Sequence, residues 1–136
     1  MADDEVTISM SEMSEMFPNA ESAREFLENH RWRGHVHCPT CSNNRITARK
    51  GKRLGYYRCR RCKDEFTVRT GTIFERSHVP LHKWLYAIYF FATDRKGISS
   101  TQLSKELGVT QATAWFMLDR LRKACEVQPQ LVGEAG

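Results

Sequence analysis

Two short stretches decide the fold: Cys38-Pro39-Thr40-Cys41 and Cys59-Arg60-Arg61-Cys62. Each places two cysteines three positions apart, and 17 residues separate the two pairs. A turn of this kind points both thiolates at one position, so two turns brought together by a hairpin supply four thiolates in a tetrahedron. No position then remains for a substrate. The spacing therefore predicts one structural zinc ion, held by Cys38, Cys41, Cys59 and Cys62.

Other uses of these cysteines are weaker interpretations. A rubredoxin-like iron centre also takes four thiolates, but the second pair encloses two arginines and no redox-partner pattern is visible. A redox-active Cys-x-x-Cys is disfavoured because no βαβ pattern surrounds either pair. His35 and His37 lie beside the first pair and could ligate metal or contact phosphate. Cys125 makes the cysteine count odd, which argues against a disulfide framework and leaves it as a buried apolar residue or a free thiol.

The residues between and after the cysteine pairs have the pattern of short strands. Residues 45–50 and 56–59 are two expected strands on either side of a glycine-bounded turn at 51–55. Residues 65–70 alternate between polar and apolar side chains and are the third expected strand. This order predicts a zinc ribbon over residues 35–76, with a short antiparallel sheet. So small a sheet has little core of its own, so we expect the metal to supply much of its stability.

After the ribbon, apolar residues recur with the 3.6-residue period of a helix. Residues 81–92 carry a broad apolar stripe, which predicts a central helix. Ser99 and Thr110 are candidate N-caps of two further helices, with Gly108 as the tight turn between them. We therefore expect a helix-turn-helix over residues 77–127, with a plain three-helix bundle as the alternative.

The third of these helices divides into two faces. The inward face carries Ala114, Met117, Leu118, Leu121 and Cys125. The N-terminal end of a recognition helix reaches base edges, which predicts DNA contacts at Thr110, Gln111, Ala112, Trp115 and Arg120. A boundary core position is an equal interpretation for Trp115. Phe116 falls on the polar face, where it could contact a thymine methyl or an absent partner domain.

Residues 9–34 are expected to form a helical segment packed on the ribbon. It contains a short helix near 10–16, opened by a Ser9–Glu12 capping box, and a longer one from 20 to about 31. The longer helix has a narrow apolar face of Ala23, Phe26, Leu27 and His30. Together with the sheet, these helices make the predicted fold class α+β.

The two ends of the chain show no periodicity. We expect residues 1–8 to be a disordered tail and residues 128–136 a mobile one. The longest uncharged apolar run, residues 84–92, is nine residues long, whereas a membrane span needs about 20. The acidic N-terminus also lacks the apolar stretch of a secretory signal. We therefore expect a cytoplasmic protein with no membrane partner.

Charge is distributed unevenly along the 136 residues. Residues 1–28 carry eight acids and one base, whereas residues 29–63 carry eleven bases and no acid. An acid-free basic block predicts a surface for a polyanion, with a solvated face as the structural alternative. Since the block covers most of the ribbon, we expect the following bases to contact DNA phosphates: Arg45, Arg49, Lys50, Lys52, Arg53, Arg58, Arg60, Arg61 and Lys63.

Several longer motifs resemble one transposase family. They are Phe17-Pro18, Arg31-Trp32, the two cysteine pairs, Phe66-Thr67-Val68-Arg69-Thr70-Gly71-Thr72-Ile73-Phe74, Pro80-Leu81-His82-Lys83-Trp84 and Thr113-Ala114-Trp115-Phe116-Met117-Leu118. In this order they are similar to the N-terminal part of zinc-ribbon insertion-sequence transposases, the bacterial group related to Merlin elements. The resemblance covers about residues 15–126.

This resemblance implies a nucleoid-associated protein that binds double-stranded DNA at the terminal inverted repeats of a transposable element. In the family a DDE catalytic domain of the ribonuclease H type follows, and its two-metal chemistry needs three carboxylates gathered on a long sheet. The 136 residues hold no such pattern, so we expect no enzymatic activity from them. The last helix would serve self-association or contact with the catalytic domain.

Two other functions remain open. A stand-alone transcriptional regulator or transposition repressor would use the same parts on a host promoter. A zinc-ribbon protein-interaction module, of the kind found in transcription machinery, would instead bind DNA weakly and with little salt dependence.

Overall fold

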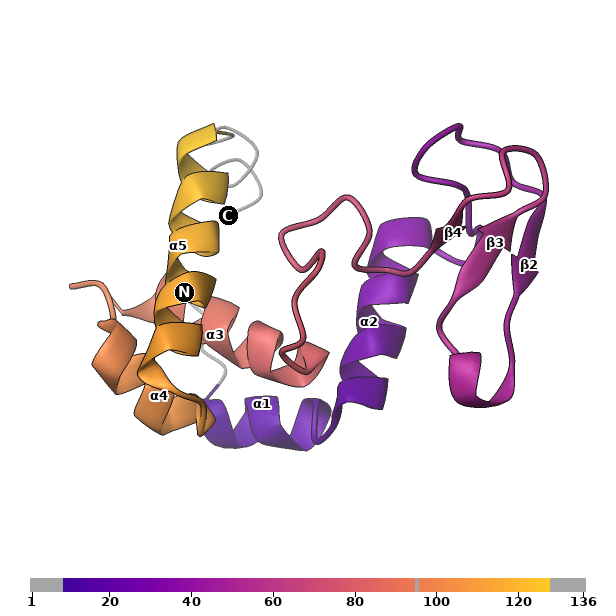
Figure 1. Ribbon diagram of the computed structural model, residues 1–136. Helices are drawn as coiled ribbons and strands as arrows, with labels where there is room; N and C mark the ends of the chain where they lie inside the picture. The colour runs from indigo at the N-terminus through magenta and orange to yellow at the C-terminus, as the bar shows by residue number, and fades with distance from the viewer. Residues whose placement is uncertain (1–8, 95, 128–136) are drawn as a thin grey trace, which may run out of the picture. The chain divides into compact units, whose positions relative to one another are not determined.

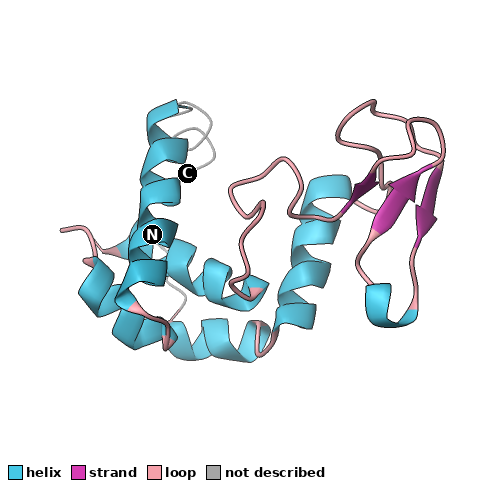
Figure 2. Ribbon diagram, viewed as in Figure 1, coloured by secondary structure: helices cyan, strands magenta, loops and turns pink. Residues whose placement is uncertain are grey.

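The computed structural model describes residues 9–94 and 96–127 (Figure 1). The tails expected at residues 1–8 and 128–136 lie outside these described residues. The chain divides into two compact units: one is Phe17–His82, and the other joins Met1–Met16 to Lys83–Gly136. The described strands all belong to the first unit, while helices occur in both (Figure 2).

The first unit contains the ribbon. Its elements are α2 (Ala20–Trp32), β2 (Ile46–Ala48), the 3-10 helix η1 (Gly51–Arg53), β3 (Tyr57–Cys59) and β4 (Glu65–Phe66). The three strands form an antiparallel sheet in the order β2-β3-β4. The predicted α+β class with a small four-cysteine ribbon is therefore confirmed.

The sheet has two unlike faces, because successive residues of a strand point to opposite sides. Cross-strand pairing gives two rows: Ala48, Tyr57 and Phe66 on one face, and Thr47, Arg58 and Glu65 on the other. We call the first the packed face, since Phe66 is buried there. The second, on which Arg58 and Glu65 are exposed, is the open face.

Helix α2 covers the packed face. Asn19 caps it: the Asn19 side chain accepts a hydrogen bond from the Ser22 N–H at 2.9 Å. At the other end Trp32 is buried and lies edge-on to two rings of the sheet, with centroids 5.5 Å from Tyr57 and 5.9 Å from Phe66. This aromatic cluster is the core that joins the helix to the ribbon.

The apolar face expected on α2 is partly wrong. Ala23 is buried, but Phe26 is 46% exposed and His30 is also exposed. Phe26 stacks on His30, with ring centroids 6.2 Å apart, and meets Phe17 edge-on at 5.1 Å. These rings therefore pack on one another, and Phe26 stays largely exposed.

The third strand is shorter than the predicted 65–70. It ends at Phe66 because Thr67 and Thr70 close a turn: the Thr67 N–H donates to Thr70 Oγ1 at 3.0 Å, and the Thr70 N–H donates to the Thr67 carbonyl at 3.1 Å. Beyond this turn, the Arg69 guanidinium donates to the carbonyls of Ser77 (3.0 Å) and Val79 (2.7 Å). Arg69 thus fixes the loop that follows the ribbon.

The second unit contains α1 (Met10–Met16), α4 (Ser100–Leu107), α5 (Gln111–Val127) and most of α3 (Leu81–Thr93). Its fully buried side chains include Trp84, Leu103, Met117 and Leu118. The apolar stripe expected over residues 81–92 is not buried to its end, because Ala92 is exposed, while Ala87 is buried. No helix in the described ranges is long and apolar enough to cross a membrane.

The predicted helix starts are confirmed by their caps. The Ser9 N–H donates to Glu12 Oε1 at 2.9 Å, and the Glu12 N–H donates to Ser9 Oγ at 3.2 Å. Ser99 accepts from the Gln102 N–H at 3.1 Å, and Thr110 accepts from the Thr113 N–H at 3.1 Å. These caps depend on residues three apart, which explains why the sequence alone reveals them.

Candidate metal centre and nucleic-acid interface

The four predicted cysteines meet at one point. The sulfur atoms of Cys38, Cys41, Cys59 and Cys62 all lie within 4.8 Å of one another. Across the two pairs, Cys38 Sγ lies 3.6 Å from Cys62 Sγ, and Cys41 Sγ lies 3.5 Å from Cys59 Sγ. Zinc–thiolate bonds of about 2.3 Å place tetrahedral sulfurs about 3.8 Å apart. The cluster therefore has the size that a zinc ion requires.

A tight turn builds the first half of this cluster. The Cys38 N–H donates to the Asn43 carbonyl at 2.9 Å, and the Ser42 N–H donates to the Cys38 carbonyl at 2.9 Å. Ser42 closes the turn in the left-handed region, at φ 64°. The Thr40 N–H then donates to Cys38 Sγ at 3.3 Å. A backbone donor aimed at sulfur stabilises the thiolate that binds metal.

The second half repeats the first. The Cys59 N–H donates to the Asp64 carbonyl at 2.9 Å, the Lys63 N–H donates to the Cys59 carbonyl at 3.0 Å, and Lys63 has φ 70°. Cys59 Sγ accepts from the N–H groups of Arg61 and Cys62, each at 3.4 Å. Two equivalent turns thus face each other across the sheet end, as the repeated Cys-x-x-Cys spacing predicts.

The electrostatics of the sulfurs also fit a divalent cation. Hydrogen bonds from two backbone N–H groups lower the pKa of the Cys59 thiol to about 6: that of Cys62 has the larger effect and that of Arg61 the smaller. The Asp64 N–H lowers the pKa of Cys62, but burial and the neighbouring sulfurs outweigh it and raise that pKa to about 12. Sulfurs this close cannot all carry negative charge unless a cation balances them, which is what zinc supplies.

Histidine is not part of this centre. Among the described residues, the cluster of three or more potential ligands contains the four cysteines and neither His35 nor His37. His37 instead places Nδ1 3.2 Å from the His35 carbonyl, and both rings are exposed. Cys125 lies half-buried on α5 as a free thiol, outside the cluster.

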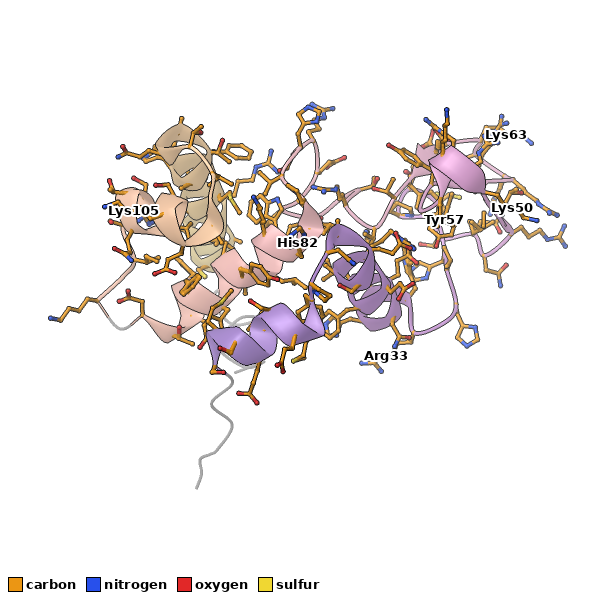
Figure 3. The ribbon with its side chains drawn as sticks, turned by 90° about the horizontal axis from the view of Figure 1, so that it is seen from below. Arg33, Lys50, Tyr57, Lys63, His82 and Lys105 are labelled. Atoms are coloured by element: carbon orange, nitrogen blue, oxygen red, sulfur yellow. The ribbon has the colours of Figure 1, made fainter. Side chains whose placement is uncertain are left out.

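Most bases of the basic block lie on the ribbon and are solvent-accessible. Of the nine bases predicted to contact phosphate, Arg49 is half-buried and the other eight are exposed. In Figure 3 the side chains of Lys50 and Lys63 extend outward, while Tyr57 lies toward α2. On the open face, Arg60 Nε donates to Thr47 Oγ1 at 3.0 Å, which fixes one guanidinium over β2.

Two of these bases have a partner that sequence analysis missed. Arg49 Nε lies 3.2 Å from Glu65 Oε2, and Arg53 Nη2 pairs with Glu65 Oε1. Arg53 lowers the pKa of Glu65, with Arg49 acting in the same direction. These contacts join residues 12 and 16 positions apart. Only the position of Glu65 just after the basic block hinted at them.

The predicted base-reading residues lie in the other unit. Gly108 turns the chain at φ 70° between α4 and α5, and the Val109 N–H donates to the Ser104 carbonyl at 3.1 Å. Thr110, Gln111 and Ala112 are exposed at the start of α5, and Trp115, 58% exposed, follows. Helix α4, the turn at Gly108 and helix α5 follow in the order expected of a helix-turn-helix, and both that assignment and the DNA contacts stay predictions.

Phe116 has a partner inside the unit. Its ring lies edge-on to Trp84 of α3, with centroids 6.5 Å apart, and the Arg120 guanidinium lies 4.7 Å from the Phe116 ring centroid. Phe116 and Arg120 are both half-buried. The ring therefore needs neither a thymine nor an absent domain to explain its position.

The comparisons with known proteins support the ribbon. Residues 18–65 match the family described as the transposase zinc-ribbon domain. The chain is also 33% identical over 124 residues to a Halobacterium salinarum protein described as "Uncharacterized protein in transposable element ISH50". That alignment covers 86% of this chain and 40% of the relative, so the chain spans less than half of its length. No solved structure matches the chain significantly.

The matched segment contains the α2 helix, all four cysteines and nearly all of the sheet. Residues 18–65 thus fold as a four-cysteine ribbon and are similar to the transposase zinc-ribbon domain.

Proposed function

We propose that the chain is the DNA-binding module of a transposase, in the group related to Merlin elements, and that it recognises the terminal inverted repeats of its element. The ribbon holds phosphates and the helix-turn-helix over residues 77–127 reads base edges. The proposal assigns recognition to these 136 residues and no catalytic step. Such a protein works in the cytoplasm, on the DNA of the nucleoid.

The open face of the ribbon is the observation that carries the proposal. Arg58 lies at its centre, on the middle strand, and α2 covers the opposite face. Arg45, Arg60 and Arg61 are exposed nearby, and residues 29–63 contain no acid. A rigid sheet with arginines on one side suits the phosphate backbone, because guanidinium groups pair with phosphate oxygens through two hydrogen bonds.

The second unit supports the reading of bases. Gln111 and Ala112 are exposed at the N-terminal end of α5, where a recognition helix meets the major groove. Glutamine can bond to both edge atoms of adenine, and alanine can contact a thymine methyl. Trp115 adds an exposed apolar surface one turn further along. Arg120, half-buried against Phe116, is placed to contribute least of the five.

Selection from a random pool of duplex DNA tests this function. Zinc-loaded protein should enrich one motif, and that motif should occur at both ends of the element that encodes the chain. Enrichment of a host promoter sequence instead would favour the regulator or repressor. Weak binding without enrichment, and with affinity that hardly changes with salt, would favour a protein-interaction ribbon.

A further inference from the structure

The Glu65 carboxylate lies between two arginines, Arg49 and Arg53, whose guanidinium groups have the chemistry to bind a phosphate. Its two carboxylate oxygens are divided between two arginines: Oε2 faces Arg49 and Oε1 faces Arg53. The three residues come from different parts of the ribbon, namely the end of β2, η1 and the start of β4. A carboxylate and a phosphate present comparable oxygens to guanidinium groups.

Both arginines are held in place by more than this carboxylate. The Arg53 guanidinium lies over the Tyr56 ring, 4.1 Å from its centroid. Arg49 follows β2, and its N–H donates to the Tyr56 carbonyl at 2.9 Å. The Tyr56 ring thus holds the Arg53 guanidinium independently of the carboxylate, and the backbone hydrogen bond anchors the main chain from which the Arg49 side chain extends.

The ion pairs are accessible to solvent and so exchangeable. The side chains of Arg49, Arg53 and Glu65 are 39%, 54% and 34% exposed. Exposed ion pairs contribute little net stability, so a polyanion that brings several phosphates at once can displace a single carboxylate. From residue 29 to residue 74 the chain has two acids, Asp64 and Glu65.

We propose that the Glu65 carboxylate is an internal substitute for a DNA phosphate, which blocks the Arg49–Arg53 pair until DNA displaces it. The inference rests on the proposed DNA-binding function and names a residue that sets its specificity. Random DNA must compete with Glu65 for these arginines, so non-specific binding is weakened. A cognate end, held also by base contacts, can complete the exchange.

A pair of matched variants tests the substitute. Glu65→Gln and Asp64→Asn each remove one negative charge from adjacent exposed positions, and Asp64→Asn keeps the backbone carbonyl that accepts from Cys59. A general charge effect would change DNA affinity equally in both. If Glu65→Gln frees two arginines, its slope of log affinity against log salt on random duplex should steepen by roughly 1–2 more than that of Asp64→Asn, because each phosphate contact contributes about 0.9.

A double-variant background separates this mechanism from others. When Arg49 and Arg53 are both alanine, Glu65→Gln should steepen the slope no more than Asp64→Asn does. Equal slopes for the two single variants would overturn the inference. So would a steeper slope for Glu65→Gln than for Asp64→Asn that persists when both arginines are alanine. Zinc content and circular dichroism establish that each variant is folded. A wild-type chain with no salt-dependent duplex affinity would overturn the proposed function itself, before any variant is compared.

Discussion

The Tyr57 hydroxyl donates a hydrogen bond to Glu28 Oε1 at 2.9 Å and so ties the middle strand of the ribbon to α2. Burial has the larger effect and this hydrogen bond the smaller, and together they raise the pKa of Tyr57 from 10.0 to about 12. The folded ribbon therefore keeps the phenolic proton at pH values where the unfolded chain has lost it. It follows that the first unit loses stability as pH rises from about 10 to 12.

The pH dependence of unfolding by urea tests this consequence. The midpoint for the wild-type ribbon should fall across that interval, and Tyr57→Phe should remove this part of the fall, because phenylalanine has no proton to lose. Tyr57→Phe should also cost about 1 kcal/mol at neutral pH, because the hydrogen bond to Glu28 can no longer form. Tyr56→Phe is the matched control and should leave the fall unchanged. An identical pH profile in Tyr57→Phe would contradict the assignment.

Loss of one zinc ligand should unfold the ribbon unit and leave the helices of the second unit in place. Metal analysis should give about one zinc per wild-type chain, and Cys59→Ser should abolish its binding. Amide signals of residues 17–82 should then collapse in an NMR spectrum, while those of α4 and α5 remain. Cys125→Ser, outside the cluster, is the control and should keep both metal and ribbon. A ribbon that keeps its structure after chelation would disprove the metal's role.

Neutralising the two arginines between Cys59 and Cys62 should weaken DNA binding to all sequences alike. Arg60→Ala with Arg61→Ala should flatten the slope of log affinity against log salt by up to roughly 0.9 for each phosphate that the variant no longer binds. The substitution keeps the Arg61 N–H that donates to Cys59 Sγ, so the metal centre should persist. Exposed Arg122 and Lys123, on α5, provide a charge-matched control pair. An unchanged slope would place the phosphate surface elsewhere.

Gln111→Ala should relax the preference at one base position of the selected motif. Gln111 is exposed, and its side-chain Nε2 donates a long hydrogen bond to Ser100 Oγ, at 3.5 Å. A bidentate contact with adenine discriminates by roughly 1–3 kcal/mol, whereas fold and salt dependence should hardly change. Leu121→Ala is the opposite control: it should destabilise the core by about 2–5 kcal/mol without altering the preferred sequence. A motif unaffected by Gln111→Ala would mean that the helical unit does not read this base.

The accuracy of prediction from sequence follows the distance between interacting residues. The cysteine cluster is predictable because each turn supplies its own two ligands, and the caps at Ser99 and Thr110 involve residues three apart. The end of β4 is not, since the competing Thr67–Thr70 turn looks like a continued strand. The ion pairs of Glu65 depend on how the hairpin folds back, which no local pattern encodes.

Helical periodicity has a related limit. It identifies the inward face of α5, where Ala114, Met117, Leu118 and Leu121 are buried. It does not identify which neighbour covers the rest of the helix. Periodicity alone therefore suggests no partner for Phe116, although Trp84 of α3 lies beside it. The prediction that Phe26 is buried failed for the opposite reason. Phe26 has the helical spacing of a buried residue, but no strand or second helix covers it enough to bury it, and it is 46% exposed.

The two-faced sheet has a consequence for how mutations are tolerated. Tyr57 and Cys59 serve the core and the metal, while Arg58 between them faces solvent. In a complete mutational scan, the effect of substitutions should alternate along β3. Substitutions of Tyr57 and Cys59 should impair folding, whereas substitutions of Arg58 should weaken DNA binding. A single-residue insertion in this strand would exchange the two faces at once. Natural variation of the ribbon should therefore come from substitutions and from length changes in the hairpin turn, and not from insertions within β3.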